Sequence, residues 1–181
     1  MNCRWAIFVS GEGTNLAALL NLRSSNIHLV VSSRAEAPAV DKARSAGIEV
    51  LVLPKMIDWV QVLKDLNTRK ISHIFLAGFM KVIPSAFLEA WKKPILNLHP
   101  SLLPAYPGLK SIERAMADNA ALGVTVHKVT SQVDGGEIVV QRQVFPAGET
   151  KNKNLDEVKK HMQLAEHEIV KKAFEEASCW T

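Results

Sequence analysis

The sequence predicts an α/β fold: a single domain with a mostly parallel, twisted sheet and helices on both of its faces. Two observations predict this fold. Short, almost wholly apolar runs, typical of strands buried on both faces, alternate with segments in which apolar residues recur at helical spacing. The chain has 181 residues, 48% of them hydrophobic, which is enough to bury a core. One domain is therefore expected over residues 1–181.

The first half of the chain repeats a strand–helix unit. Strands are expected over residues 5–10, 27–32, 49–53, 72–77 and 94–99. Helices are expected over residues 14–22, 39–46, 59–70 and 84–91. Gly47 should end the second helix, because glycine is the residue most often found just after a helix C-terminus. Strands joined by helices in this way lie parallel, and parallel sheets bind ligands at the carboxyl ends of their strands.

The second half of the chain has a different pattern. Residues 123–130 and 137–145 alternate apolar and polar side chains, and a tight Asp-Gly-Gly turn lies between them at residues 134–136. The two runs are expected to pair as a hairpin or to extend the edge of the sheet. A long helix is expected over residues 154–177, where Asn154 and the glutamate three residues later resemble a capping box.

Composition and charge exclude several classes of protein. The net charge of +4 favours anionic ligands, but a nucleic-acid partner is not expected because no basic run of five or more residues occurs. The longest apolar runs, such as residues 74–80, are too short to span a bilayer, and the N-terminus lacks the cleavage site of a signal peptide. Cys3 and Cys179 form no C-x-x-C pattern and are expected to be thiols in a reducing compartment. We therefore expect a soluble, cytoplasmic protein with no membrane partner.

A loop with two glycines, residues 10–16 (SGEGTNL), separates the first expected strand from the first helix. Glycine lets the backbone approach a ligand closely, and the N–H groups of a helix N-terminus favour phosphate. Thr14 and Asn15 could add side-chain donors. One alternative is a dinucleotide site, which the missing third glycine and the missing acid after the second strand disfavour. The other is a purely structural turn.

The strand expected over residues 94–99 ends in polar residues. Asn97 and His99 are two apart, so their side chains share one face, and Leu98 faces the other way. Pro100 cannot continue a central strand, so the chain should leave the sheet just after His99. An amide can donate to a developing oxyanion, and an imidazole titrates near neutral pH. The alternative is a structural histidine that is hydrogen-bonded to an asparagine.

The turn at residues 134–136 places an acid before two glycines. The glycines should let the turn fold tightly and expose the carboxylate of Asp134, which could orient His99 and pass protons through water. An ordinary turn aspartate is the alternative. His127 faces the same way as Thr125 in an alternating run, so a structural or supporting role is expected for it. The histidines show no metal-ligand spacing, and no metal is expected.

Together these motifs resemble the signature of the folate-dependent formyltransferases. Several separated motifs in one order are more specific than any one of them. The resemblance covers residues 6–145, and more weakly the final helix. It is carried by residues 76–80 (LAGFM), 97–104 (NLHPSLLP), 106–108 (YPG), 123–127 (GVTVH) and 134–136 (DGG), with the glycine loop before them.

The resemblance implies a formyltransferase-type, Rossmann-like fold and a set of functional residues. The implied catalytic residues are Asn97, His99 and Asp134. The implied contacts to the phosphate and ribose of the acceptor are Gly13, Thr14, Asn15, Gln163 and Glu166. Of these, Gln163 is expected at the phosphate and Glu166 at the ribose hydroxyls, because a carboxylate repels phosphate. The implied folate contacts are Met80, Lys81, Val82, Ile83, Asn97 and Asp134, with the loop over residues 130–134.

Within the family, the resemblance points to the branch of purine biosynthesis in which 10-formyltetrahydrofolate is the formyl donor and glycinamide ribonucleotide is the acceptor. The protein would act as a monomer or a homodimer without a metal. Lys81 stands where the family often carries arginine, and Glu12 must point outward if its loop binds phosphate. Two alternatives remain. One is the same chemistry on another amine, such as a nucleotide-sugar amine or methionyl-tRNA, and the other is a non-catalytic ligand-binding module on the same scaffold.

Overall fold

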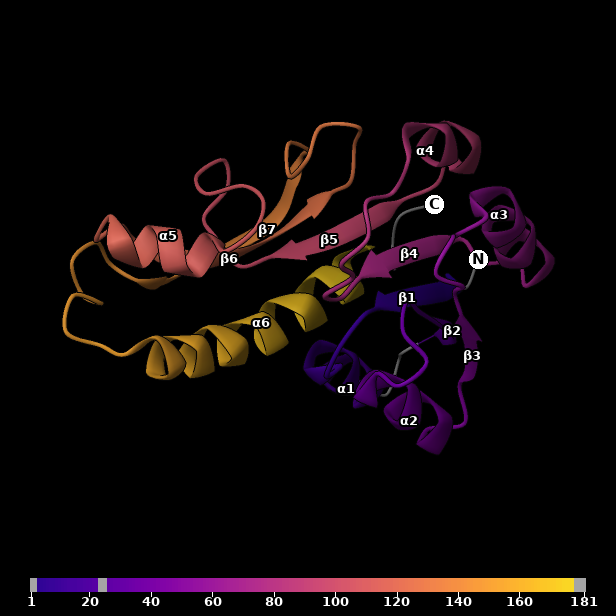
Figure 1. Cartoon of the computed structure of the whole chain (residues 1–181), viewed down its shortest axis with the longest axis horizontal. Coiled ribbons are helices and arrows are strands. Elements are labelled where there is room, and N and C mark those ends of the chain that lie inside the picture. Colours follow the sequence, from indigo (N-terminus) through magenta and orange to yellow (C-terminus); the bar gives the residue numbers. More distant parts are fainter. Residues whose placement is uncertain (1–2, 23–25, 178–181) are drawn as a thin grey trace. The chain divides into compact units, whose positions relative to one another are not determined.

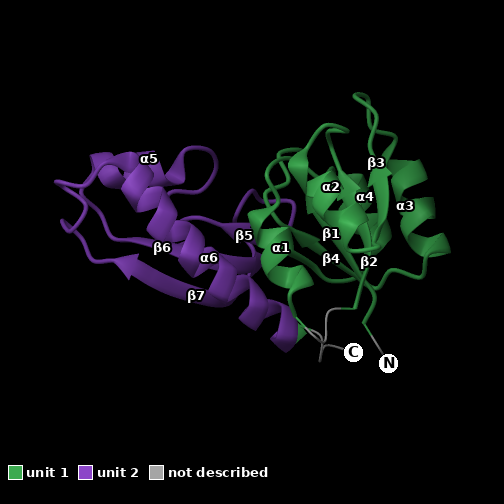
Figure 2. Cartoon of the chain, turned by 90° about the horizontal axis from the view of Figure 1, so that it is seen from below, with its two compact units in different colours: residues 1–96, 177–181 green, residues 97–176 purple. Residues whose placement is uncertain are grey.

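A computed structural model describes residues 3–22 and 26–177 of the chain (Figure 1). The chain divides into two compact units, a first unit of residues 1–96 with 177–181 and a second unit of residues 97–176 (Figure 2). The strands are β1 (Trp5–Val9), β2 (Ile27–Ser32), β3 (Glu49–Val52), β4 (His73–Leu76), β5 (Ile95–His99), β6 (Leu122–Lys128) and β7 (Ile138–Phe145). The helices are α1 (Thr14–Leu20), α2 (Pro38–Ser45), α3 (Trp59–Thr68), α4 (Ser85–Trp91), α5 (Ser111–Ala117) and α6 (Leu155–Ala177).

The strands follow the order β3-β2-β1-β4-β5-β6-β7, so the predicted α/β fold with a mostly parallel sheet is confirmed. In the first unit, β1 pairs in parallel with β2 and β4, and β2 pairs in parallel with β3. Every residue of β1 and β4 is buried, as expected for strands covered on both faces. Because such crossovers are right-handed, α1 and α2 cover one face of these strands and α3 covers the other.

Local sequence signals explain where several helices begin and end. The side chain of Asp58 caps α3 by accepting hydrogen bonds from the N–H groups of Val60 and Gln61, at 3.0 and 3.1 Å. Gly47 follows α2 with φ of 72°, and its N–H donates to the carbonyl of Arg44, which confirms the predicted helix end.

The second unit contains the antiparallel pair predicted for the second half of the chain. β6 pairs with β7, with Thr125 opposite Gln141 and Val126 opposite Val140. The pair is therefore a hairpin, and β7 also lies at the edge of the sheet. At the start of α6, the side chain of Asn154 accepts a hydrogen bond of 2.8 Å from the N–H of Glu157, as the predicted capping motif requires.

One described helix was not predicted from the sequence. α5 spans only seven residues, and its N-cap residue, Lys110, has a left-handed backbone and makes no side-chain capping bond. Ile112 and Ala115 are its only buried apolar residues, which is too short a pattern to identify as a helix. β2 has its predicted bounds, and each of the remaining elements differs from its predicted bounds by one or two residues at one or both ends.

Other expectations concern cysteines, membranes and domains. Cys3 is a buried thiol, and Cys179 lies outside the described residues. Within residues 3–22 and 26–177, every helix is too short or too polar to cross a membrane. The prediction of one domain over residues 1–181 stays a prediction.

Candidate active site

β5 delivers two polar side chains to the second unit. Asn97 and His99 lie on the same face of the strand, and Leu98 between them faces the other way and is buried. The strand ends at His99 because Pro100 has no N–H group with which to continue the ladder. The side chain of His99 is only 8% exposed, so its ring atoms meet protein groups rather than bulk water.

The turn between β6 and β7 delivers Asp134. Its backbone is left-handed, with φ of 51°, a conformation that aspartate adopts more readily than most residues. The N–H of Gly135 donates to the carbonyl of Gln132 at 3.3 Å, which closes the turn. Gly136 has to be a glycine here, because a Cβ at this position would collide with the carbonyl oxygen of Lys128.

The carboxylate of Asp134 is where the predicted catalytic side chains meet. Its Oδ1 lies 3.4 Å from Nδ2 of Asn97 and 3.4 Å from Nε2 of His127. Its Oδ2 lies 3.4 Å from Nδ1 of His99 and accepts a hydrogen bond of 2.7 Å from the backbone N–H of Gly108. The structure therefore brings Asn97, His99 and Asp134 together in the second unit, with His127 beside them.

The expectation that the glycine turn exposes this carboxylate is wrong. The Asp134 side chain is 10% exposed. The left-handed conformation lies at Asp134 itself and not at the glycines after it, and the carboxylate accepts from the N–H of Gly108 within the protein. A buried carboxylate needs such donors, because an unpaired charge away from water is costly.

Nε2 of His127 lies beside both Asn97 and Asp134. Nδ1 of His127 lies 2.9 Å from the carbonyl oxygen of Lys128, which can only accept, so Nδ1 carries a hydrogen. In the neutral ring Nε2 accepts from Nδ2 of Asn97 at 3.1 Å, whereas in the protonated ring it donates to Oδ1 of Asp134, 3.4 Å away. The second hydrogen of the same amide points to Asp134 at 3.4 Å, a long contact that a substrate oxygen could replace. The supporting role expected for His127 stays a prediction.

His99 has an acceptor beside each ring nitrogen. Its Nε2 donates to the backbone carbonyl of Tyr106 at 2.9 Å, and its Nδ1 faces Asp134 at 3.4 Å. An imidazolium, with a hydrogen on both nitrogens, satisfies both acceptors. The bond to Tyr106 is the shorter of the two, so the Tyr106 carbonyl holds Nε2 more firmly than Asp134 holds Nδ1.

The surroundings of Asp134 stabilise its ionised form. The hydrogen bond with His127 is the largest cause, and the N–H of Gly108 and the charge of His99 add to it. Burial acts in the opposite direction, yet the net effect lowers the pKa of Asp134 from 3.8 to about 2. At neutral pH Asp134 is therefore ionised, and its carboxylate accepts hydrogen bonds and orients their donors.

The first unit holds the glycine loop. The carbonyl of Gly13 accepts from the N–H of Ala17 at 2.9 Å, which begins α1 directly after the loop. Gly13 has φ of 68°, and a Cβ there would lie 2.6 Å from the Cβ of Ala39, so only glycine lets the loop pass this close to α2. Glu12 is exposed, as it must be if this loop binds phosphate. Asn15 is buried at the start of α1.

The first unit also holds the predicted folate contacts at residues 80–83. They lie in the connection that follows β4, where Met80 is 72% exposed and Val82 is 79% exposed. The N–H of Met80 donates to Oγ of Ser10 at 2.8 Å, which ties this connection to the end of β1. Two exposed apolar side chains on an anchored loop suit contact with an aromatic ligand.

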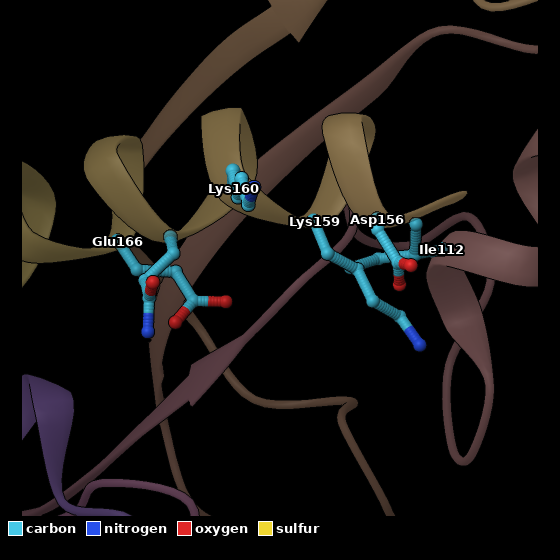
Figure 3. A pocket seen from close by; sticks show the side chains of 6 residues that line it. Ile112, Asp156, Lys159, Lys160 and Glu166 are labelled. Carbon is cyan, nitrogen blue, oxygen red and sulfur yellow. The ribbon is translucent and has the colours of Figure 1, made fainter. Parts of the chain in front are cut away.

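The second unit contains a cavity of about 540 Å³ beside α6 (Figure 3). Gln163 and Glu166, the residues implied at the acceptor, both line it, as i, i+3 neighbours on one helix face. Its other lining residues are Ile112, Asp156, Lys159 and Lys160. Lys159 pairs with Glu113 at 2.8 Å, whereas Lys160 makes no ion pair with any residue that the structure describes.

Comparison with known proteins identifies the family. Residues 3–174 match the formyl transferase family. The chain belongs to the formyl transferase family. It is 32% identical to the phosphoribosylglycinamide formyltransferase of Escherichia coli, over 90% of this chain and 81% of that protein. It is 34% identical to the Haemophilus influenzae protein of that name, over 91% of this chain and 82% of the other.

Solved structures of formyl transferases agree with this assignment. A phosphoribosylglycinamide formyltransferase from Anaplasma phagocytophilum has a TM-score of 0.90 at 31% identity, covering 98% of this chain and 88% of its own.

The chain is also 34% identical, over 95% of its length, to a human protein named trifunctional purine biosynthetic protein adenosine-3. It spans only 18% of that protein, and no more than 18% of the other trifunctional relatives.

Several groups at the site of this family member were not predicted. The carbonyl of Tyr106 and the N–H of Gly108 are backbone groups, which every residue type offers, so no sequence pattern marks them. Lys160 could have been found, since it lies three residues before Gln163 and so on the same helix face. In the described part of the chain, no group of three or more His, Cys, Asp or Glu residues could hold a metal ion.

Proposed function

We propose that the protein transfers the formyl group of 10-formyltetrahydrofolate to the amine of glycinamide ribonucleotide. The observation that carries the proposal is the convergence of Asn97 and His99 on Asp134, each at 3.4 Å. Membership of the formyl transferase family supports it, as do relatives of similar length that are named phosphoribosylglycinamide formyltransferase.

The reaction is a direct acyl transfer. The neutral amine attacks the formyl carbon, and the carbonyl oxygen becomes an oxyanion in a tetrahedral intermediate. The bond between that carbon and N10 of the folate then breaks, while the amine loses one proton and N10 gains one. The amide of Asn97 and Nδ1–H of His99 donate to the oxyanion, each giving up a long contact to Asp134. One such donor is worth roughly 3 kcal/mol.

Asp134 helps to move the proton. Its lowered pKa, about 2, keeps it ionised at neutral pH, so that it orients the water through which the proposed route from the amine to N10 runs. Burial of its side chain strengthens its interactions with Asn97 and His99, because charges interact more strongly away from bulk water.

The phosphate of the acceptor needs a counter-charge. A phosphate monoester carries nearly two negative charges at neutral pH, whereas Gln163, the phosphate contact expected in the second unit, is neutral. We infer that Lys160, which lines the same cavity as Gln163, supplies a positive charge there. Glu166 in that cavity serves the ribose hydroxyls, as a carboxylate accepts hydrogen bonds from them.

An absorbance assay of folate release tests the function. Purified protein, 10-formyltetrahydrofolate and one amine are mixed, with glycinamide ribonucleotide, a nucleotide-sugar amine and methionyl-tRNA as separate acceptors. Turnover should require an acceptor and should be fastest with glycinamide ribonucleotide. Faster turnover with another amine would reassign the acceptor, and binding of folate without turnover on any amine would favour a non-catalytic ligand-binding module.

Removal of a phosphate contact should raise the Michaelis constant of the acceptor. Thr14→Ala should raise that constant roughly 10- to 100-fold, since a hydrogen bond to a charged group is worth about 1.5–3 kcal/mol. Lys160→Gln should raise it by a smaller factor that shrinks as salt is added. In both variants kcat and the constant for the folate should change little. Thr68→Ala, at an exposed threonine at the end of α3, is the control. A fall in kcat alone would contradict the assignment.

A further inference from the structure

The connection from β5 to α5 is held by side chains of neighbouring strands. Residues 100–110 form no helix or strand, so their backbone groups need other hydrogen-bond partners. Within this connection, Ser101 and Leu103 bond to side chains of β6 and β7. These bonds lie close in sequence to Tyr106, whose carbonyl accepts from His99.

Thr125 of β6 is the centre of this network. Its hydroxyl donates to the carbonyl of Ser101 at 2.6 Å and accepts from the N–H of Leu103 at 3.2 Å. It also accepts from Nε2 of Gln141 at 2.9 Å. The hydroxyl has one hydrogen and two lone pairs, so its capacity is fully used. Thr125 is fully buried, which makes the loss of any of these bonds costly.

Gln141 of β7 completes the network from the adjacent strand. It lies directly opposite Thr125 in the β6–β7 pairing. One hydrogen of its amide goes to Thr125, and the other goes to the carbonyl of Leu103 at 2.9 Å. Two cross-strand neighbours thus hold three backbone groups of residues 101–103. We call Thr125 and Gln141 the loop clamp.

The loop clamp connects to His99 through a short stretch of backbone. Oγ of Ser101 donates to the carbonyl of Ala105 at 2.7 Å, which fixes the residue just before Tyr106. The carbonyl of Tyr106 then accepts from Nε2 of His99 at 2.9 Å. A shift of residues 101–105 would therefore move the acceptor that orients the ring of His99.

We propose that Thr125 and Gln141 are positioning residues for His99. They hold residues 101–106 so that the Tyr106 carbonyl keeps a hydrogen on Nε2 and turns Nδ1 toward Asp134, 3.4 Å away. The chemistry at Nδ1 rests on the proposed formyl transfer, whereas the orientation of the ring does not. Misplacement of a catalytic group by about 1 Å can cost roughly 100-fold in rate, so the clamp should matter for turnover.

The test compares Thr125→Val with wild type. Valine keeps the shape of threonine and removes all three hydrogen bonds of the hydroxyl. We expect kcat to fall roughly 10- to 100-fold, with the Michaelis constants changed much less. The pH midpoint of kcat should move, and so should the titration of the His99 ring measured by NMR. Thr125→Ser, which keeps a hydroxyl, should recover most of the lost kcat.

Two further variants separate positioning from folding. Thr150→Val is the matched control, because Thr150 is also buried in the second unit but its hydroxyl has no hydrogen-bond partner among the residues that the structure describes. It should change neither kcat nor the His99 titration. Gln141→Leu removes the two bonds of the amide and should shift the His99 titration in the same direction as Thr125→Val, which keeps the test usable if that variant does not fold.

The NMR titration distinguishes this proposal from the proposed function. If wild type turns over none of the amines but Thr125→Val still shifts the titration of His99, the result would support the positioning role and reject formyl transfer. An unchanged titration and an unchanged pH midpoint, with only a lower melting temperature, would overturn the proposal and leave Thr125 and Gln141 with a structural role.

Discussion

His99→Ala should lower kcat by roughly two to four orders of magnitude while the protein stays folded. The substitution removes the ring whose Nδ1 faces Asp134 at 3.4 Å, and with it one of the two proposed oxyanion donors. It also removes the hydrogen bond of 2.9 Å to the carbonyl of Tyr106. The stability lost should be about 1–3 kcal/mol, which a domain stabilised by about 5–15 kcal/mol can tolerate.

The matched control for this experiment is His73→Ala. His73 is also a buried histidine, 4% exposed, but it lies in β4 of the first unit and packs against Trp5 with ring centroids 4.7 Å apart. It should lose stability to a similar degree and keep its kcat. Circular dichroism and thermal unfolding would follow the fold, and the absorbance assay would follow turnover. An active His99→Ala protein would remove His99 from the mechanism.

Asp134→Asn should have the second largest effect on turnover, a fall in kcat of roughly 100- to 1,000-fold. Asparagine has nearly the same shape and also tolerates the left-handed backbone, φ of 51°, at this position. Its amide oxygen can still accept from the N–H of Gly108. What the variant loses is the negative charge between Asn97 and His99, so a fall in kcat would report on that charge. Unchanged turnover would show that the carboxylate takes no part in proton transfer.

Asp134→Asn should also change how the free energy of unfolding depends on pH. Because folding lowers the pKa of Asp134 from 3.8 to about 2, its ionised form stabilises the native state at every pH above 3.8. That contribution, about 2 kcal/mol, is lost as the pH falls from about 4 through the folded pKa. Wild type should therefore lose more free energy of unfolding than Asp134→Asn between pH 5 and pH 2. Parallel curves for the two proteins, from denaturant unfolding at each pH, would contradict this pKa.

Local sequence determined most of the fold. The strand at residues 27–32 was predicted with its observed bounds, because a run of apolar residues between turn signals is typical of a buried strand. Gly47 predicted the end of α2, because the residue after a helix often has a left-handed backbone, which glycine adopts at no cost; its φ is 72°. The short helix α5 was missed because seven residues with two buried apolar side chains do not form a recognisable period.

The candidate site was only partly predictable. The spacing of Asn97 and His99 placed both on one face of a strand, since side chains alternate along a strand whatever surrounds it. Sequence also marked Asp134 by its two glycines, and the resemblance to a family joined these residues into one expected site. Their catalytic roles stay predictions that the variants above test.

The order of residues along the chain predicts which elements form and which side chains reach the end of β5, because helical and strand periods are local properties. The packing of distant segments leaves the side chain of Asp134 only 10% exposed, with the N–H of Gly108 as its closest donor. The same packing brings the carbonyl of Tyr106 to His99, and Thr125 and Gln141 to the backbone of residues 101–103. Backbone N–H and carbonyl groups are common to nearly all residues, so their positions depend on how distant segments pack.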